Sequence, residues 1–492
     1  MRQLVGPIVL HSGLLLAGLG LLWAIRIVPV LTVRRVLAAG GLAYLTGVAA
    51  VGQVCVLLLV LGVPFSLPTV GLVCAAFAAP LVVALRRRAP AAPASSASQP
   101  PVLGLEKWLA AATLTGFAVV FVVGLVSVGL QALPYDAWNL WGRRAKLFFL
   151  SEQLPLDVFQ GLAYNLNGTI HPDYPIVLPL FESMHLRALG RFDASAIQVA
   201  LWTFWGAFVW AACYLGGRVT RPLVWALVVP AAAVMVIGPL TSAYADVPVA
   251  LYICVGVLVL GLWVETTSRS YLALAVIMLG GAAGFKNEGL TAAAAAFLAA
   301  GALVVLRRQW PRVRDLAIAG AAWAALAVIP WRLWTAAHDL RGDIPITSGF
   351  SPSFLADRTD RVRPSIAALY EQLINRTSIA VFVSFGIALA VARLGRRHHS
   401  PAAAFYLAVG VLYFTAIVWT YWISPLDLTF HIGNSVGRIS VGFGFIAVAA
   451  ILHLSGALHA EEREVGLSPA AATTPNADGV DARHPTVTAL QD

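Results

Sequence analysis

Apolar runs long enough to cross a lipid bilayer recur along the whole chain, and they restrict its fold more than any other feature. A helix needs about 20 mostly apolar residues to cross the roughly 30 Å hydrocarbon core, where it satisfies its own backbone hydrogen bonds. The 59% hydrophobic content and mean hydropathy of +0.81 exclude an ordinary soluble domain. We therefore expect an all-α polytopic membrane protein, a bundle of about 13 transmembrane helices. The apolar runs, a few of them somewhat short, lie at 4–24, 36–61, 67–85, 106–133, 194–215, 222–240, 247–264, 271–285, 290–306, 315–335, 377–393, 402–424 and 436–455.

The segments between these runs divide the chain into units. Residues 4–24 follow Arg2 without a small-residue cleavage site, which predicts a permanent span rather than a cleaved signal. Residues 89–101 are rich in Ala, Pro and Ser, as flexible linkers are, and the last 33 residues are polar. The predicted units are three N-terminal spans (1–85), a flexible cytoplasmic linker (86–105), a core (106–335) with an outer loop at 134–193, a second outer loop (336–376), C-terminal spans (377–458) and a disordered cytoplasmic tail (459–492).

Arginine is unevenly distributed between the loops. Clusters such as Arg34–Arg35, Arg86–Arg88 and Arg307–Arg308 occupy alternate loops, whereas the short loops 62–66 and 239–245 contain no Lys or Arg. The positive-inside rule makes the basic loops cytoplasmic and explains the net charge of +10 without a nucleic-acid partner. We therefore expect a multi-pass protein of the plasma or inner membrane.

This orientation places several polar segments on the extracytoplasmic face. They are the loops 134–193 and 336–376, the turn 425–438, the turn at Lys286, and Asp246. Residues 175–190 contain Glu182, His185 and Arg187 and would make a poor lipid-facing span, so we expect them along the outer surface or only partly inserted. Segments distant in the chain would thus converge on one side, as in an active site built from several loops.

The first of these loops carries the strongest candidate for a catalytic acid or base. Asp136 follows a long apolar run and is flanked by Tyr135, Trp138 and Trp141. A carboxylate partly desolvated by aromatic rings has a raised pKa and can accept a proton near neutral pH. A helix cap at Asp136 and an interfacial aromatic belt are the alternatives, but sugar rings also stack on such faces.

Cationic side chains on the same side are candidates for binding a phosphate. Lys286 stands at a turn between two short apolar runs, beside Glu288. A buried ion pair between the two is the alternative, but a lipid phosphate facing the ammonium explains better why a charge is kept at the membrane boundary. The further candidates share a guanidinium group, which suits bidentate phosphate contacts; they are Arg143, Arg144, Arg332 and Arg438.

Other polar residues on this side could orient a substrate. Asp246 begins an apolar run. Its carboxylate could cap the N-terminus of a helix or could belong to a substrate site, and its position fits both roles equally well. His171 and Asp173 flank Pro172, which stiffens the peptide between them, and His431 lies in the last outer turn. No ligand spacing supports a metal site built from these residues, and the four cysteines lie in apolar runs, so we expect neither a metal nor another cofactor.

Together these residues resemble the motifs of the GT-C polytopic glycosyltransferases, with a layout closest to the protein O-mannosyltransferases and lipid A aminoarabinose transferases. The motifs cover residues 106 to about 335, and the remainder agrees in layout only. The chain departs from the family pattern at Ala137, where a second acid is frequent, and at Asn287–Glu288, which are inserted before Gly289. The matching elements are the acid Asp136 in the first outer loop, His171-Pro172-Asp173-Tyr174-Pro175 in place of a His-Pro-Pro-like element, the acid-to-Pro element Asp246-Val247-Pro248, and the Lys286 turn.

The resemblance implies transfer of a sugar from a polyprenyl-phosphate donor to a hydroxyl of an envelope glycan, lipid or protein acceptor outside the membrane, with inversion. Negative charge then develops on the departing phosphate while the acceptor loses a proton. Asp136 is assigned as the base and Lys286 as the phosphate ligand, with Arg143, Arg144, Arg332 and Arg438 as helpers. Substrate-orienting roles fall to Tyr135, Trp138, Trp141, His171, Asp173, Asp246, Glu288 and His431, and the loop 336–376 is a candidate cover.

Two other functions are compatible with the sequence. A transporter or flippase of a lipid-linked or anionic solute would place ionisable pairs at mid-depth, yet the runs 194–215 and 402–424 contain no Asp, Glu, Lys or Arg. A noncatalytic assembly subunit would keep the fold without needing Asp136. The concentration of charge at the outer ends of the runs favours the enzyme.

Overall fold

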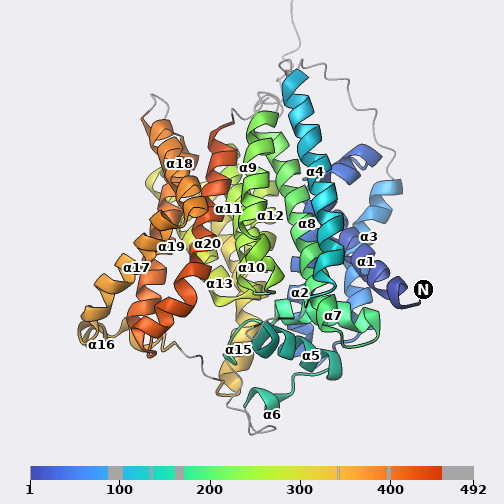
Figure 1. The fold of residues 1–492 in the computed structure, drawn as a ribbon, viewed down its shortest axis with the longest axis horizontal. Coiled ribbons are helices and arrows are strands. Elements are labelled where there is room, and N and C mark those ends of the chain that lie inside the picture. The colour runs from blue at the N-terminus through green and yellow to red at the C-terminus, as the bar shows by residue number, and fades with distance from the viewer. Residues whose placement is uncertain are drawn as a thin grey trace, which may run out of the picture.

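The computed structural model describes residues 2–86, 104–131, 133, 137–160, 171–340, 342, 344–395 and 400–456 (Figure 1). All regular secondary structure in these ranges is helical, as predicted. Tyr135, Asp136 and nearly all of the predicted linker and tail lie outside the described residues.

Eleven of the described helical segments are long and apolar enough to cross a membrane, which confirms a polytopic helical membrane protein. Two further apolar helices, α9 (Pro222–Met235) and α12 (Arg269–Phe285), are shorter, so the thirteen crossings remain a prediction. The eleven are α1 (Arg2–Ala24), α2 (Val33–Val60), α3 (Leu67–Arg86), α4 (Gly104–Val128), α8 (Ala194–Val219), α11 (Asp246–Thr266), α13 (Asn287–Leu306), the continuous segment of α14 (Trp310–Trp323), η2 (Ala324–Val328) and α15 (Ile329–Ala337), α18 (Thr377–Leu394), α19 (Pro401–Ile423) and α20 (Leu428–Leu454).

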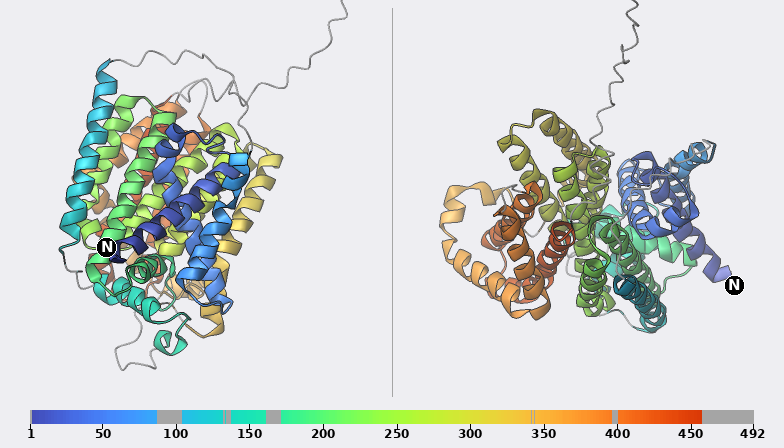
Figure 2. Two further views of the ribbon diagram at one scale, coloured as in Figure 1. Left: turned by 90° about the vertical axis from the view of Figure 1, so that its right-hand side faces the viewer. Right: turned by 90° about the horizontal axis from the view of Figure 1, so that it is seen from above.

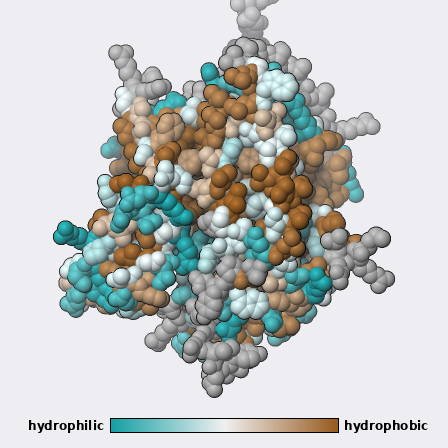
Figure 3. Space-filling model, in the orientation of Figure 1, coloured by the Kyte–Doolittle hydropathy of each residue, from teal (hydrophilic) through white to brown (hydrophobic). Residues whose placement is uncertain are grey.

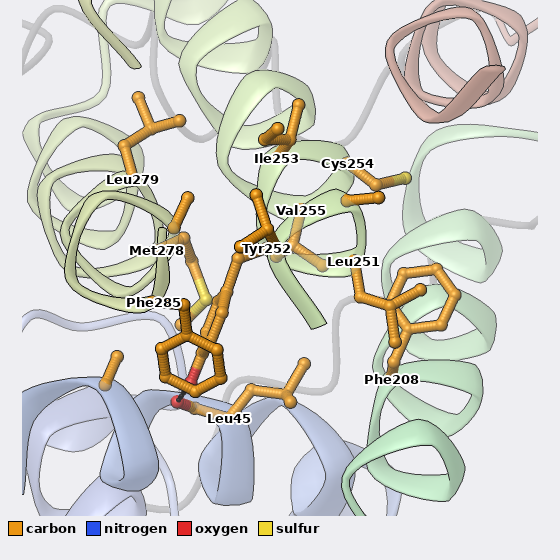
Figure 4. Packing of buried hydrophobic residues seen from close by; sticks show 14 of the residues in the cluster. Leu45, Phe208, Leu251, Tyr252, Ile253, Cys254, Val255, Met278, Leu279 and Phe285 are labelled. Atoms are coloured by element: carbon orange, nitrogen blue, oxygen red, sulfur yellow. Dashed lines mark hydrogen bonds between the residues drawn. The ribbon is translucent and has the colours of Figure 1, made fainter. Parts of the chain in front are cut away.

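Helix α11 lies at the centre of the bundle. A helix that is apolar all round can be enclosed on every side, and α11 is buried from Val247 to Val264. Figure 2 (right) shows α1–α3 on one side of the molecule and α18–α20 on the other, with α8–α13 between them. In Figure 4, Tyr252 of α11 reaches α2, where its hydroxyl donates to the carbonyl of Leu45 at 2.9 Å, and its ring meets Phe285 edge-on.

Close approach of the central helices depends on small residues before the Lys286 turn. A Cβ at Gly281 would lie 2.9 Å from the ring of Tyr252, and one at Gly284 would lie 2.2 Å from the amide nitrogen of Gln53. Backbones approach closely where such residues face a neighbouring helix, so this stripe sets the position of α12 and of the turn that follows it.

Polar segments gather at one end of the bundle, which we call the loop end. It carries the short helices α5 (Arg143–Leu150), α6 (Leu156–Phe159), α7 (Val177–Leu189), α16 (Pro352–Ala356) and α17 (Val362–Asn375) (Figure 1). Arg218 and Arg393 lie in the last turns of α8 and α18, and Arg269 and Arg312 lie in the first turns of α12 and α14, at the helix ends that lead to loops predicted to be cytoplasmic. Figure 3 shows apolar residues over the middle of the molecule, between these ends.

Residues 175–190, which were expected along the outer surface or only partly inserted, form helix α7. Its 13 residues are too few to span a bilayer, and it lies across the loop end beside α5 (Figure 1). Its side chains from Val177 to Leu186 are buried, however, because α1, α2, α5 and α8 pack around it. The segment is therefore part of the core at this end.

The predicted cover loop is folded onto the end of α19. The indole of Trp422 donates to the carbonyl of Leu355 at 3.0 Å, and that of Trp419 donates to Gly349 at 3.3 Å. Arg358 donates to the carbonyl of Ser424 at 2.7 Å, which satisfies an acceptor that the helix end leaves open. These bonds hold the segment between α15 and α17 in place.

Candidate active site at the loop end

The centre of the loop end is a buried cluster of three charges. Lys286 Nζ lies 2.8 Å from Asp246 Oδ1 and 2.7 Å from Glu288 Oε1. Asp246 begins α11, Glu288 lies in the first turn of α13, and Lys286 occupies the extended break between α12 and α13. The side chains of Lys286 and Asp246 are each 8% exposed.

The electrostatics of this cluster keep Lys286 charged. Burial alone would lower the pKa of the ammonium, but the carboxylates of Asp246 and Glu288 outweigh burial and raise that pKa above its ordinary value. The two carboxylates also satisfy much of the donor capacity of Lys286. The structure thus contains the ion pair that the sequence offered as an alternative to phosphate binding, with Asp246 as a second partner.

A second ionic cluster adjoins the first through Asn287. Arg332 of α15 lies 3.3 Å from Asp173 Oδ2, and the amide of Asn287 donates to the same oxygen at 3.2 Å. Arg332 also donates to Asn287 Oδ1, and the indole of Trp331 donates to the carbonyl of Asp173 at 2.9 Å. Asp173 is therefore fixed through both its side chain and its main chain.

Arg144 holds the segment that carries Asp173. Its buried guanidinium donates to the carbonyls of His171 and Tyr174. Burial lowers the pKa of Arg144 to about 10, which leaves it charged at neutral pH. His171 adopts a φ of +58°, which is costly for a residue with a side chain, and its ring stacks on Tyr174 at 4.5 Å. The Arg144 side chain is thus directed at the main chain of this segment.

Of the other predicted residues of the first loop, the structure describes Trp138, Trp141 and Arg143. Trp141 is buried, with its ring centroid 6.1 Å from that of Tyr174. Trp138 is 40% exposed and meets Phe192 edge-on, and Arg143 is half-buried. Of the two tryptophans, Trp138 is the one exposed enough to contact a molecule from outside.

A cavity of about 230 Å³ opens beside the charged clusters. Arg438 lies over the ring of Tyr244 at 5.2 Å, and Arg376 donates to the carbonyl of Gly437. Asp246 and Arg438 line this cavity and also a smaller adjoining one that contains Lys286 and Glu288. Two guanidinium groups and one carboxylate face the larger space, which favours a ligand with an anionic group. Its lining comprises Tyr244, Asp246, Val247, Gln372, Arg376, Gly433, Asn434, Gly437, Arg438 and Val441.

His431 lies one helical turn before the cavity. Its Nδ1 is 2.9 Å from the hydroxyl of Ser424, and its ring meets Tyr421 edge-on at 4.9 Å. The residue is therefore part of the packing between the start of α20 and the end of α19.

The structure brings together six of the predicted site residues, and it adds others that sequence reasoning missed. Gln372 and Arg376 line the cavity, and Asn287 joins the two ionic clusters. Arg376 follows an amphipathic segment and directly precedes a span, which is a signal for an interfacial cation. The six predicted residues are Asp173, Asp246, Lys286, Glu288, Arg332 and Arg438.

Within the described ranges, no group of three or more His, Cys, Asp or Glu side chains is arranged to hold a metal ion. Comparison with known proteins finds no match to this chain among family models, curated proteins or solved structures.

Proposed function

We propose that the protein is a GT-C type glycosyltransferase that moves a sugar from a polyprenyl-phosphate donor to a hydroxyl of an envelope glycan, lipid or protein acceptor on the extracytoplasmic face. The observation that carries this proposal is the cavity at the loop end, where Asp246, Arg376 and Arg438 converge from three parts of the chain. Its lining combines cations for a phosphate with amide, carboxylate and aromatic groups suited to a sugar.

The reaction assigns a separate task to each charge. The acceptor oxygen attacks the anomeric carbon while the bond from that carbon to the phosphate oxygen breaks, and polyprenyl phosphate departs as an anion. Asp136 takes the proton of the acceptor hydroxyl. Arg376 and Arg438 stabilise the charge that develops on the phosphate, and such preorganised groups supply much of an enzyme's rate enhancement.

Lys286 then has a positioning role. Its ammonium is engaged by Asp246 and Glu288, so phosphate binding is assigned first to Arg438 and Arg376. By holding Asp246 at the cavity wall, Lys286 fixes the carboxylate that would accept hydrogen bonds from sugar hydroxyls. Asp173 is held in the same way by Arg332 and Asn287.

The arrangement of charges favours surface chemistry over passage of a solute. Asp246 and Lys286 lie at the ends of their helices, and the interior of α11 between Val247 and Val264 carries no ionisable acid or base other than Tyr252 and Cys254. A transporter or flippase would place ionisable pairs along a path through the bundle. The charges gathered at the loop end instead support a site at the membrane boundary.

Sugar transfer by the purified protein in liposomes tests this function. Polyprenyl-phosphate sugars are supplied with extracted envelope acceptors, and products are followed by mass spectrometry. Arg438→Met and Asp136→Asn should each lower the rate at least about 100-fold, the size of effect seen when a group that stabilises the transition state is removed. Arg363→Met, which changes an exposed arginine of α17, is the matched control and should keep the wild-type rate. Full transfer by Arg438→Met and Asp136→Asn would refute these assignments.

A further inference from the structure

Helix α17 presents an apolar stripe on its outer face. Ile366, Tyr370 and Ile374 recur at four-residue intervals and are 42%, 62% and 48% exposed. This spacing places all three side chains on one side of a helix, and Ala367 lies on the same side. Glu371 is also exposed and lies at the edge of the stripe.

The opposite face of α17 belongs to the protein core and to the cavity. Ser365 and Leu369 are fully buried, because α17 packs against α18, α19 and α20. Gln372 lines the cavity, and so does Arg376, which follows the last residue of the helix. The helix therefore separates the cavity from whatever contacts its outer stripe.

The chain continues from α17 directly into a candidate membrane span. Only Arg376 separates α17 from α18, a candidate membrane span. Val381 and Phe385 of α18 are 61% and 55% exposed, as expected of side chains in contact with acyl chains. Figures 1 and 2 show α17 at the edge of the bundle, beside α18, and the exposure of its outer stripe agrees with this position.

We propose that α17 lies in the outer-leaflet interface of the bilayer, with Ile366, Tyr370 and Ile374 inserted among the lipids. An amphipathic helix in this position buries its apolar face about 5–10 Å into the boundary between headgroups and acyl chains. Its occupant is the membrane itself rather than a partner protein, because α17 leads directly into α18, a candidate membrane span with exposed apolar side chains. The cavity wall at Gln372 and Arg376 then borders directly on the bilayer, whatever reaction takes place in the cavity.

Site-directed spin labelling tests this placement without reference to any activity. Single cysteines are introduced as Ile366→Cys, Tyr370→Cys and Ile374→Cys in the full chain, with Ala367→Cys as a substitute if one of them fails to fold. The four native cysteines are buried, so a thiol-reactive label added to folded protein selects the new one. The labelled protein is placed in vesicles of phosphatidylethanolamine and phosphatidylglycerol, with Glu371→Cys as the water-side control and Val381→Cys as the lipid-side control.

Collision rates with oxygen, which dissolves in lipid, and with a water-soluble nickel chelate give the result. The oxygen-to-nickel ratio should be higher at positions 366, 370 and 374 than at 371, and should approach the ratio at 381. A ratio at the stripe equal to that at 371 would place α17 in water. Low collision rates with both reagents would mean that protein covers the stripe, and either result would overturn the proposal.

Discussion

The ammonium of Lys286 lies 2.8 Å from the carboxylate of Asp246, forty residues earlier in the chain. This contact joins the start of α11, the central helix, to the break between α12 and α13. Glu288 completes the cluster from the first turn of α13. Each buried charge is stable in this cluster only because it is paired with an opposite charge. Removing one of them should therefore lower the stability of the fold, whether or not it also affects catalysis.

Removing Lys286 should destabilise the fold strongly. Lys286→Met leaves the buried carboxylate of Asp246 beside the partly buried one of Glu288, and loss of one partner of a buried ion pair typically costs about 3–5 kcal/mol. The free energy of unfolding in detergent, measured with a denaturant, checks this. The double variant Lys286→Met with Asp246→Asn should recover part of the loss, whereas equal stability of wild type and Lys286→Met would show that the cluster contributes nothing.

Glu182 should make stability fall as pH rises. Its carboxyl is fully buried, both oxygens lack a hydrogen-bond partner among the described residues, and burial raises its pKa well above the ordinary value. Above pH 4.5 the unfolded chain loses this proton while the folded chain keeps it, so unfolding becomes more favourable by up to about 1.4 kcal/mol per pH unit until the folded pKa is reached.

Glu182→Gln removes this dependence and keeps the shape of the side chain. Unfolding free energies of both proteins between pH 5 and 8 provide the measurement. The variant should be the more stable of the two at pH 8, with the difference shrinking towards pH 5. A difference that stays constant over this range would contradict a neutral buried Glu182.

His185 should make the stability of the fold decrease as pH falls. Burial lowers the pKa of this imidazole to about 4, and its Nδ1 lies 2.9 Å from Nε2 of His11. Between pH 6.5 and about 4 the unfolded chain binds a proton that the folded chain does not, so stability is lost as pH falls through this window. His185→Gln should flatten the loss, as measured by thermal unfolding at pH 4.5 and 7. An unchanged slope would assign the acid sensitivity to other groups.

Arg144 should control the mobility of residues 171–176. Arg144→Gln removes donors to the carbonyls of His171 and Tyr174, and the positive φ of His171 is then no longer held in place. Hydrogen exchange of this segment should accelerate, while exchange in α11 should not change. Arg143→Gln, which alters the neighbouring half-buried arginine, is the control, and equal exchange in the two variants would contradict this role.

Much of the fold could be predicted because a membrane imposes a simple rule on sequence. Apolar runs and arginine clusters identify the helices and the two ends of the bundle without knowledge of packing. Helix α7 was less predictable: Glu182, His185 and Arg187 argued against a lipid-facing span, but its burial depends on the helices that surround it. Burial of polar residues beneath other helices leaves no periodic signal in a single sequence.

The candidate site was predictable in its residue types but not in its pairings. Asp246, Lys286 and Glu288 attract attention as charges beside apolar runs, yet their mutual neutralisation depends on how α11, α12 and α13 pack. The position of Arg376 before a span indicates an interfacial cation, but such cations are common at membrane boundaries and do not by themselves indicate a site. Asp136 lies outside the described residues, so its role as the base remains a prediction.

The most direct test of the loop-end cavity as a site of sugar transfer is mass spectrometry of the envelope glycans and glycolipids of cells that make the protein. Deleting it should remove a single sugar from one product, wild type and Arg363→Met should restore that sugar, and Arg438→Met should not. Unchanged glycans after deletion, or full restoration by Arg438→Met, would contradict the account.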